Sequence, residues 1–184
     1  MLSLDSPRWQ DLKANGDLLE IPKILARIRG ASSQVNRLQG IDDLWELVYH
    51  QYDIFTASYA VLPYLVDLMA FELPAERIRL IGCIGMIAAL AYRPAIDPVP
   101  DDLRADYTEA LHRAAPLILE CFSLSWSDEE HAQLCGALSA VQGHPVMAIN
   151  LLDTFIDPSA ILCDRCQEFF PSFGYVLIKG DFPG

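Results

Sequence analysis

The chain has 184 residues, of which 52% are apolar, and a formal net charge of −12. The apolar fraction excludes a disordered chain, and the length is enough for one continuous hydrophobic core. The acidity argues against a protein that binds a nucleic-acid backbone, because such proteins use Lys and Arg to displace the counterions of the phosphates.

Apolar residues recur at helical spacing along most of the chain, and capping residues and prolines bound the segments. Ser6 followed by Pro7 is typical of a helix start, and Asn15 followed by Gly16 of a helix end. Three prolines between residues 94 and 100 predict an extended loop. We therefore predict about eight helices, at residues 7–14, 21–30, 35–51, 56–69, 76–92, 101–122 (broken before Pro116), 127–142 and 145–155.

A proline-led apolar motif recurs at residues 21–25, 62–66 and 115–119, with a weaker copy at 144–147. Recurrence at roughly 40 residues, with helical spacing inside each unit, is typical of stacked helical hairpins. Proline suits the first turn of a helix, where its missing N–H costs nothing. The motif therefore predicts an all-α, right-handed α-solenoid in which each proline opens the second helix of a hairpin.

The most apolar helix and one tryptophan are assigned to the core. Residues 78–92 are so apolar that we expect this helix to have neighbours on most sides. Gly82 and Gly85 within it predict a close helix contact rather than a phosphate-binding loop. Trp45 shares an apolar stripe with Leu44 and Val48, so we expect its ring to be buried between two hairpins.

The composition changes after residue 157, which predicts a solenoid over 1–157 and a C-terminal cap over 158–184 with one or two short β-strands. Cys163 and Cys166 have the spacing of a zinc-binding or redox pair. A structural zinc needs four ligands, and no second CxxC and no HxxxH completes the set. We therefore predict neither a bound metal nor a cofactor.

Two carboxylate–imidazole pairs, Glu109 with His112 and Asp128 with His131, are each spaced to share a helix face. Two such pairs occur in di-iron bundles, but that site also needs two further inward carboxylates on facing helices. The other helical patterns are apolar on their inner faces. No nucleophile elbow, Walker loop, dinucleotide glycine motif or HExxH motif occurs, so we predict that the protein is not an enzyme.

The odd count of five cysteines fits reduced thiols in a cytoplasmic protein better than a disulfide framework. No stretch reaches the roughly 18 uncharged apolar residues of a membrane helix. Residues 1–10 show no basic region followed by an apolar one, so we expect no signal peptide. The expected location is the cytoplasm, with no membrane contact.

The negative charge is concentrated in residues 97–130, which contain nine acidic residues and only two arginines. Such a segment favours a basic protein partner through electrostatic steering, although acidity also serves solubility alone. Asp128 and Glu129, at the start of the next helix, are expected on a turn near the acidic residues 101–106. The predicted partner-binding residues are Asp97, Asp101, Asp102, Asp106, Asp128 and Glu129.

Residues 43–65, DLWELVYHQYDIFTASYAVLPYL, resemble a family of bacterial HEAT-like repeat proteins. Its members share a helix ending in His-Gln, an aromatic turn, an Ala with Thr or Ser, and a helix with a VPxL-like motif. Residues 14–17 and 21–25 match the preceding unit of that family, and residues 163–166 are similar to the cysteine-containing tail of some members. The resemblance implies an α-solenoid without catalytic residues, and some members look like immunity proteins encoded beside secreted type VI or polymorphic toxins.

These patterns together favour an immunity protein that binds and neutralises a cognate bacterial toxin. A basic nuclease is the toxin that the acidic segment matches best, and occlusion or distortion of its active site would need no turnover. Two alternatives stay open at this stage: a general scaffold or adaptor, and a small metal or redox protein. The oligomeric state is left open.

Overall fold

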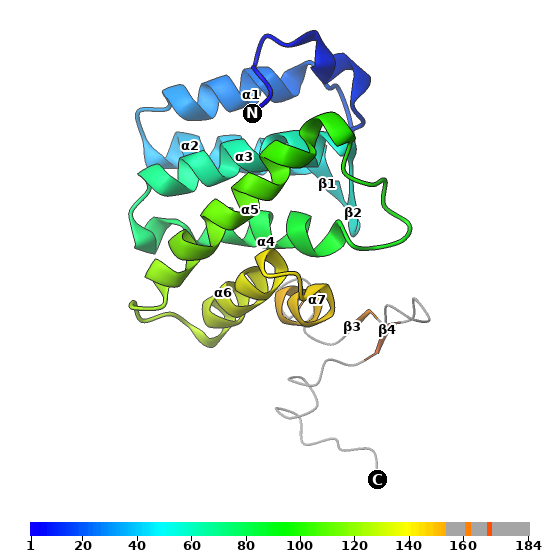
Figure 1. Ribbon diagram of the computed structural model, residues 1–184. Helices are drawn as coiled ribbons and strands as arrows, with labels where there is room; N and C mark the ends of the chain where they lie inside the picture. The colour runs from blue at the N-terminus through cyan, green and yellow to red at the C-terminus, as the bar shows by residue number, and fades with distance from the viewer. Residues whose placement is uncertain (154–160, 163–168, 171–184) are drawn as a thin grey trace.

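The computed structural model describes residues 1–153, 161–162 and 169–170 (Figure 1). This part of the chain is mostly helical, which confirms the all-α prediction. The elements, in chain order, are the 3-10 helix η1 (Pro7–Asp11), α1 (Glu20–Gly30), α2 (Gln34–Val48), β1 (Tyr49–His50), β2 (Asp53–Ile54), α3 (Thr56–Phe71), η2 (Pro74–Glu76), α4 (Ile78–Leu90), α5 (Asp101–Cys121), α6 (Asp128–Val141), α7 (Pro145–Asp153), β3 (Ile161–Leu162) and β4 (Phe169–Phe170). None of the described helices combines the length and apolar character of a membrane span.

Three of the connections between consecutive helices lie along one edge of the molecule, on the left in Figure 1. They join α1 to α2, α3 to α4, and α5 to α6. We call this side the turn edge and define it as residues 31–38, 71–77 and 117–129. The β1–β2 hairpin and the long α4–α5 loop lie on the opposite side. Segments far apart in sequence are therefore gathered on the turn edge.

Helix α4 lies at the centre, as its apolar sequence predicts. It packs against α6 and α7 on one side and α3 on the other, and ten of its residues are buried. Gly85 makes the close contact possible, because a Cβ there would lie 2.7 Å from the Cα of Ala137 in α6. Gly82 faces Gln133 of the same helix. The predicted close helix contact is confirmed.

The prediction that each motif proline opens the second helix of a hairpin holds only for Pro145, because Pro22 opens the first helix of the α1–α2 pair and the other two prolines open no helix. Pro145 begins α7 and Pro22 lies in the first turn of α1, but Pro63 and Pro116 lie inside α3 and α5. An interior proline costs about 3 kcal/mol, since it removes one backbone hydrogen bond and crowds the preceding turn. Both helices nevertheless continue, because α3 is buried on most sides and α5 buries a full apolar stripe. The predicted break before Pro116 is therefore absent.

Helix α2 ends earlier than the predicted residue 51, because the chain turns into a short β-hairpin. Gln51 and Tyr52 both have positive φ, 47° and 67°, which matches the type I′ turn of a two-residue hairpin between β1 and β2. Arg93 supports the turn, since its Nη1 donates to the backbone oxygen of Tyr52 at 2.7 Å. His50 is thus exposed on a strand instead of ending a helix.

Trp45 is only half-buried, so the prediction of a ring enclosed between two hairpins is wrong. The buried stripe of α2 runs through Ile41, Leu44 and Val48, and Trp45 lies one position to its side. The indole stacks on the ring of Tyr49, with centroids 4.5 Å apart. A position beside the stripe thus places the ring at the margin of the core, packed against it but not enclosed.

The predicted cap, residues 158–184, lies largely outside the described residues. Within it, β3 and β4 pair antiparallel and β3 lies against α7, which agrees with the expectation of one or two short strands. Cys163 and Cys166 fall outside the described residues.

Candidate binding surface

The predicted acidic residues around the start of α5 are paired within the chain itself. The carboxylate of Asp97 lies 2.8 Å from Lys13 Nζ, and that of Asp102 lies 2.8 Å from Arg8 Nε. The hydrogen bond from Arg8 lowers the pKa of the Asp102 carboxyl. The pairs that complete this set join Asp101 to Arg104 and Asp106 to the amino group of Met1. These cations offset much of the local charge that the sequence suggests.

Asp128 and Glu129 lie in the first turn of α6, beyond the other end of α5. A helix of 21 residues spans about 30 Å, so the expectation of one acidic surface on neighbouring turns is wrong. Asp128 and Glu129 are exposed and have no ion pair with another described residue. Of the six predicted partner-binding residues, the two without a counter-charge thus lie on the turn edge.

The two carboxylate–imidazole pairs do not combine. Glu109 and His112 line a shallow depression on the outer face of α5. The imidazole of His131 packs edge-on against Phe122, with ring centroids 5.5 Å apart. Among the residues that the structure describes, no three His, Cys, Asp or Glu side chains gather at metal-binding distance.

Cys83 in α4 and Cys121 in α5 are buried thiols. Burial raises the pKa of Cys83 to about 12, and burial also raises the pKa of Cys121. A thiolate is the form that attacks substrates and binds metals. Cys83 and Cys121 therefore stay protonated near neutral pH and act as small core side chains.

The turn edge carries a row of exposed apolar side chains that sequence reasoning missed. Phe71 is 88% exposed, Val35 75% and Leu73 67%. The other exposed members of the row are Leu38, Leu119 and Leu124. Helical spacing assigns such residues to a core, and only the folded arrangement shows that helix ends leave them uncovered. Several large apolar side chains exposed on one edge of a protein make that edge a candidate interaction site.

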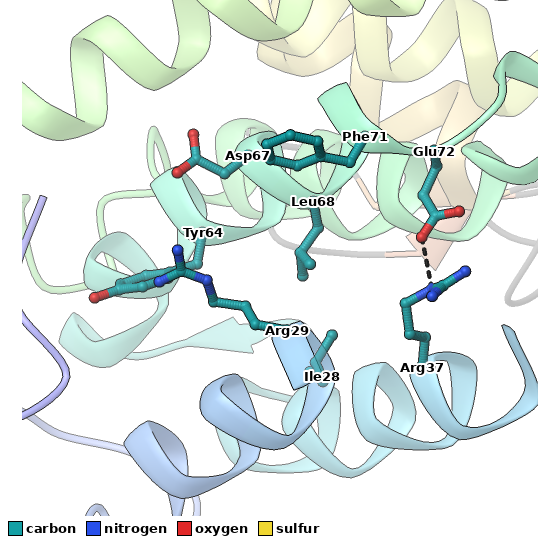
Figure 2. A pocket seen from close by; sticks show the side chains of 8 residues that line it. All are labelled: Ile28, Arg29, Arg37, Tyr64, Asp67, Leu68, Phe71 and Glu72. Atoms are coloured by element: carbon teal, nitrogen blue, oxygen red, sulfur yellow. Dashed lines mark ion pairs between the residues drawn. The ribbon is translucent and has the colours of Figure 1, made fainter. Parts of the chain in front are cut away.

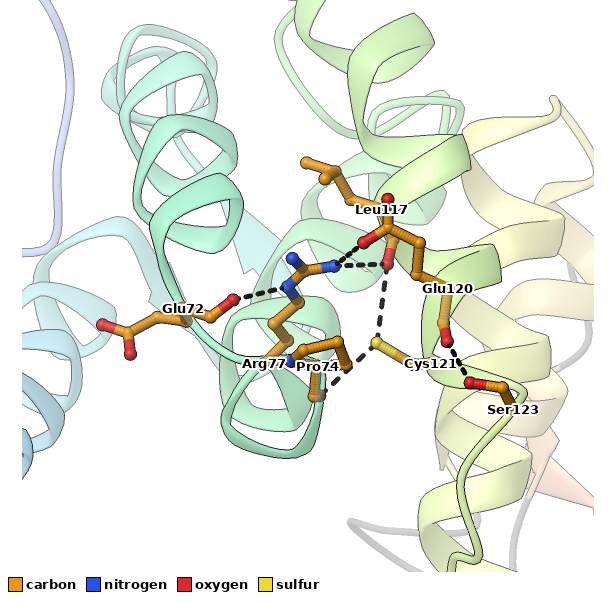
Figure 3. Close-up of polar contacts among 7 residues, drawn as sticks. All are labelled: Glu72, Pro74, Arg77, Leu117, Glu120, Cys121 and Ser123. Atoms are coloured by element: carbon orange, nitrogen blue, oxygen red, sulfur yellow. Dashed lines mark hydrogen bonds and ion pairs between the residues drawn. The ribbon is translucent and has the colours of Figure 1, made fainter.

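A buried arginine ties two connections of the turn edge together (Figure 3). Arg77 Nη1 donates to Glu120 Oε2 at 2.6 Å and to the backbone oxygen of Leu117 at 3.1 Å. Arg77 Nε donates to the backbone oxygen of Glu72 at 3.0 Å. The guanidinium therefore joins the end of α3 to the end of α5, and it fixes the spacing of the exposed side chains around it.

A second ion pair extends this link to the first connection. Arg37 Nε, from the first turn of α2, lies 2.7 Å from Glu72 Oε1. The N–H is not directed at that oxygen, so it remains a buried donor without a hydrogen bond. Burial, followed by contact with Glu76, raises the pKa of Glu72 although Arg37 opposes the shift. All three connections are thus linked through Glu72 and Arg77.

A groove of about 360 Å³ lies between the first two helices and α3 (Figure 2). Its floor is apolar, with the buried Ile28 and the half-buried Leu68. Figure 2 shows Arg29 with Tyr64 at one end and the Arg37–Glu72 pair at the other. The eight lining residues are Ile28, Arg29, Arg37, Tyr64, Asp67, Leu68, Phe71 and Glu72. Because Phe71 and Glu72 belong to both, the groove opens at the turn edge.

The comparisons with known proteins add no relative. No family model, curated protein or solved structure matches the chain. The interpretation of the turn edge and of the groove therefore rests on the geometry of this chain.

Proposed function

We propose that the chain is a protein-binding protein and that the turn edge is the surface that meets its partner. The observation that carries this proposal is the row of exposed apolar residues, with Phe71 88% exposed at its centre. Aromatic and aliphatic anchors of this kind supply most of the binding energy at protein interfaces. The cross-links of Arg77 and Glu72 hold the row in place before binding, which lowers the entropy cost of docking.

The charge of the turn edge favours a basic partner. Asp128 and Glu129 are exposed there, whereas the cations Arg37 and Arg77 are already paired. A second copy of this acidic chain would bring like charges together. A basic protein instead gains from steering at long range and from apolar contact at short range.

Within this class we propose an immunity protein that neutralises a cognate bacterial toxin, with a basic nuclease as the toxin. The similarity of residues 43–65 to bacterial HEAT-like proteins supports this choice. The helical pairs joined at the turn edge suit HEAT-like units of a right-handed α-solenoid, which present extended binding surfaces. Binding would occlude or distort the active site of the toxin without turnover. A general scaffold is the alternative use of the same surface.

The proposal is tested by asking whether this chain neutralises one particular toxin. Open reading frames beside the gene are expressed singly in a host, and each product that arrests growth is co-expressed with this chain. We expect one toxic product to become harmless, and the purified pair to form a stoichiometric complex in which toxin activity is inhibited. Binding to a non-toxic protein in place of a toxin would favour the scaffold and contradict the immunity proposal.

A further inference from the structure

The groove between α1 and α3, which shares Phe71 with the apolar row, has the properties of a small-ligand site. We propose that it binds a monocarboxylate with an apolar body, the carboxylate on Arg29 and the body over Ile28 and Leu68. The volume of about 360 Å³ lies within the roughly 300–1,000 Å³ of ligand pockets. An apolar floor with a few convergent polar groups is also the usual composition of such pockets.

The charge balance of the groove selects an anion. The carboxylate of Asp67 is paired with Arg113 of α5, and that of Glu72 with Arg37. Arg29 is exposed and makes no hydrogen bond or ion pair with any residue that the structure describes. Arg37, the other arginine that lines the groove, is paired with Glu72. Arg29 is therefore the uncompensated charge of the groove. A guanidinium fits a carboxylate through two parallel hydrogen bonds.

The two ends of the groove fix the orientation of the ligand. Both carboxylates of the groove, Asp67 and Glu72, already have an arginine partner, and so does Arg37 at the Glu72 end. The anionic group of the ligand therefore belongs at the end that holds the unpaired Arg29. The hydroxyl of Tyr64 already donates to the backbone oxygen of Leu2, so its ring serves as a wall. The apolar body then runs along Leu68 toward Phe71. The exposed ring of Phe71 would then contact the ligand on one face.

Two sources supply this chemistry: a free aromatic or aliphatic acid, and the C-terminal residue of a polypeptide. Titrations of the full chain, followed by amide shifts in NMR spectra, separate them. The probes are 4-phenylbutyrate, the peptide Gly-Gly-Phe with a free C-terminal carboxylate, and the same peptide with a C-terminal amide. We expect saturable binding of at least one acid, with shifts at the end of α1 and along α3, and none for the amide.

Matched variants test the role assigned to Arg29. Arg29→Gln should weaken binding of the acid by about tenfold or more, as expected for a lost charge-assisted hydrogen bond. Arg27→Gln is the control, because Arg27 lies on the same helix but is paired with Asp43 and does not line this groove. Phe71→Ala should weaken binding severalfold without affecting the fold, since its side chain is exposed.

The outcomes are distinct. Binding of 4-phenylbutyrate alone assigns the groove to a free acid, and binding of the peptide acid assigns it to a polypeptide C-terminus. Absence of saturable binding for both acids, equal affinity in Arg29→Gln and the wild type, or equal affinity for the amide would overturn the proposal.

Discussion

The guanidinium of Arg77 is almost fully buried, with 6% of its side chain exposed, whereas the Glu120 carboxylate that it contacts at 2.6 Å is 54% exposed. The two partners of this ion pair therefore differ in what their removal leaves behind. Without Glu120, Arg77 keeps its bonds to the backbone oxygens of Glu72 and Leu117. Without Arg77, both oxygens lose a donor, although the Cys121 thiol still donates to that of Leu117 at 3.5 Å, and a cavity remains.

Removal of Arg77 should therefore cost much more stability than removal of Glu120. We expect Arg77→Ala to lower the free energy of unfolding by about 2–4 kcal/mol, since hydrogen bonds to charged groups and buried volume are lost together. Glu120→Gln should cost less than Arg77→Ala, because the Gln amide oxygen can still accept from Arg77 and the guanidinium keeps its two backbone acceptors. Urea unfolding of both variants measures the difference, and equal costs would contradict the assigned role of Arg77.

The contact between α4 and α6 predicts a second contrast. Gly85→Ala should cost about 1–3 kcal/mol, because the new Cβ would lie 2.7 Å from both the Cα and the Cβ of Ala137. Gly30→Ala is the matched change, since a Cβ at the end of α1 meets nothing within 4 Å. It should be neutral or stabilising by up to about 1 kcal/mol. Thermal unfolding of the two variants provides the test, in which a harmless Gly85→Ala would argue against the close helix packing.

Buried acids predict a loss of stability in alkali. Burial raises the pKa of Cys83 to about 12 and the pKa of Tyr59 to about 12. Above pH of about 9 the unfolded chain releases protons that the native state retains, so the free energy of unfolding should fall as pH rises. Urea unfolding between pH 8 and pH 10.5, roughly the window between the two ordinary pKa values, measures the slope. In Cys83→Ala the free energy of unfolding should fall less at the lower end of this pH range. A constant stability across the range would refute the argument.

The turn edge predicts a change in affinity without a change in stability. Phe71→Ser should alter the free energy of unfolding by about 0.5 kcal/mol or less, because the ring is 88% exposed. If this ring anchors the partner, the Kd for the neutralised toxin should rise by about tenfold or more. Leu19→Ser is the control, since Leu19 is exposed at the opposite end of α1. Unchanged affinity for Phe71→Ser would remove the row from the interface.

The acidic residues predict an effect on the association rate that depends on where they lie. Asp128→Asn with Glu129→Gln should slow association with a basic partner severalfold at low salt, and added salt should reduce the difference. Asp101→Asn with Asp102→Asn removes the same formal charge from the other end of α5, where Arg8 and Arg104 already compensate it. In stopped-flow mixing, Asp101→Asn with Asp102→Asn should slow association less than Asp128→Asn with Glu129→Gln does. A larger effect of Asp101→Asn with Asp102→Asn would place the interface at the start of α5.

The sequence predicted features that depend on local pattern. Apolar spacing located α4 at the centre, and the helix predicted from residue 127 begins in the structure at the N-cap Ser127. Interior prolines were misjudged because the burial of α3 and α5 outweighs a local penalty. The pairing of Arg8 with Asp102 joins residues 94 positions apart, and no local pattern encodes such a contact. The groove and the turn edge were missed for the same reason, since both arise where separate helix ends meet.

Two of the acceptors of Arg77 are backbone oxygens, which every residue type provides. The side chains of Glu72 and Leu117 therefore have little influence on those bonds, and neighbouring exposed positions such as Phe71 and Leu73 have none. If the surface of the partner changes, substitutions at Phe71 or Leu73 can restore the fit. The three connections keep their positions, because Arg77 and Glu72 still hold them together. The architecture thus separates the residues that hold the edge together from those that are free to diversify.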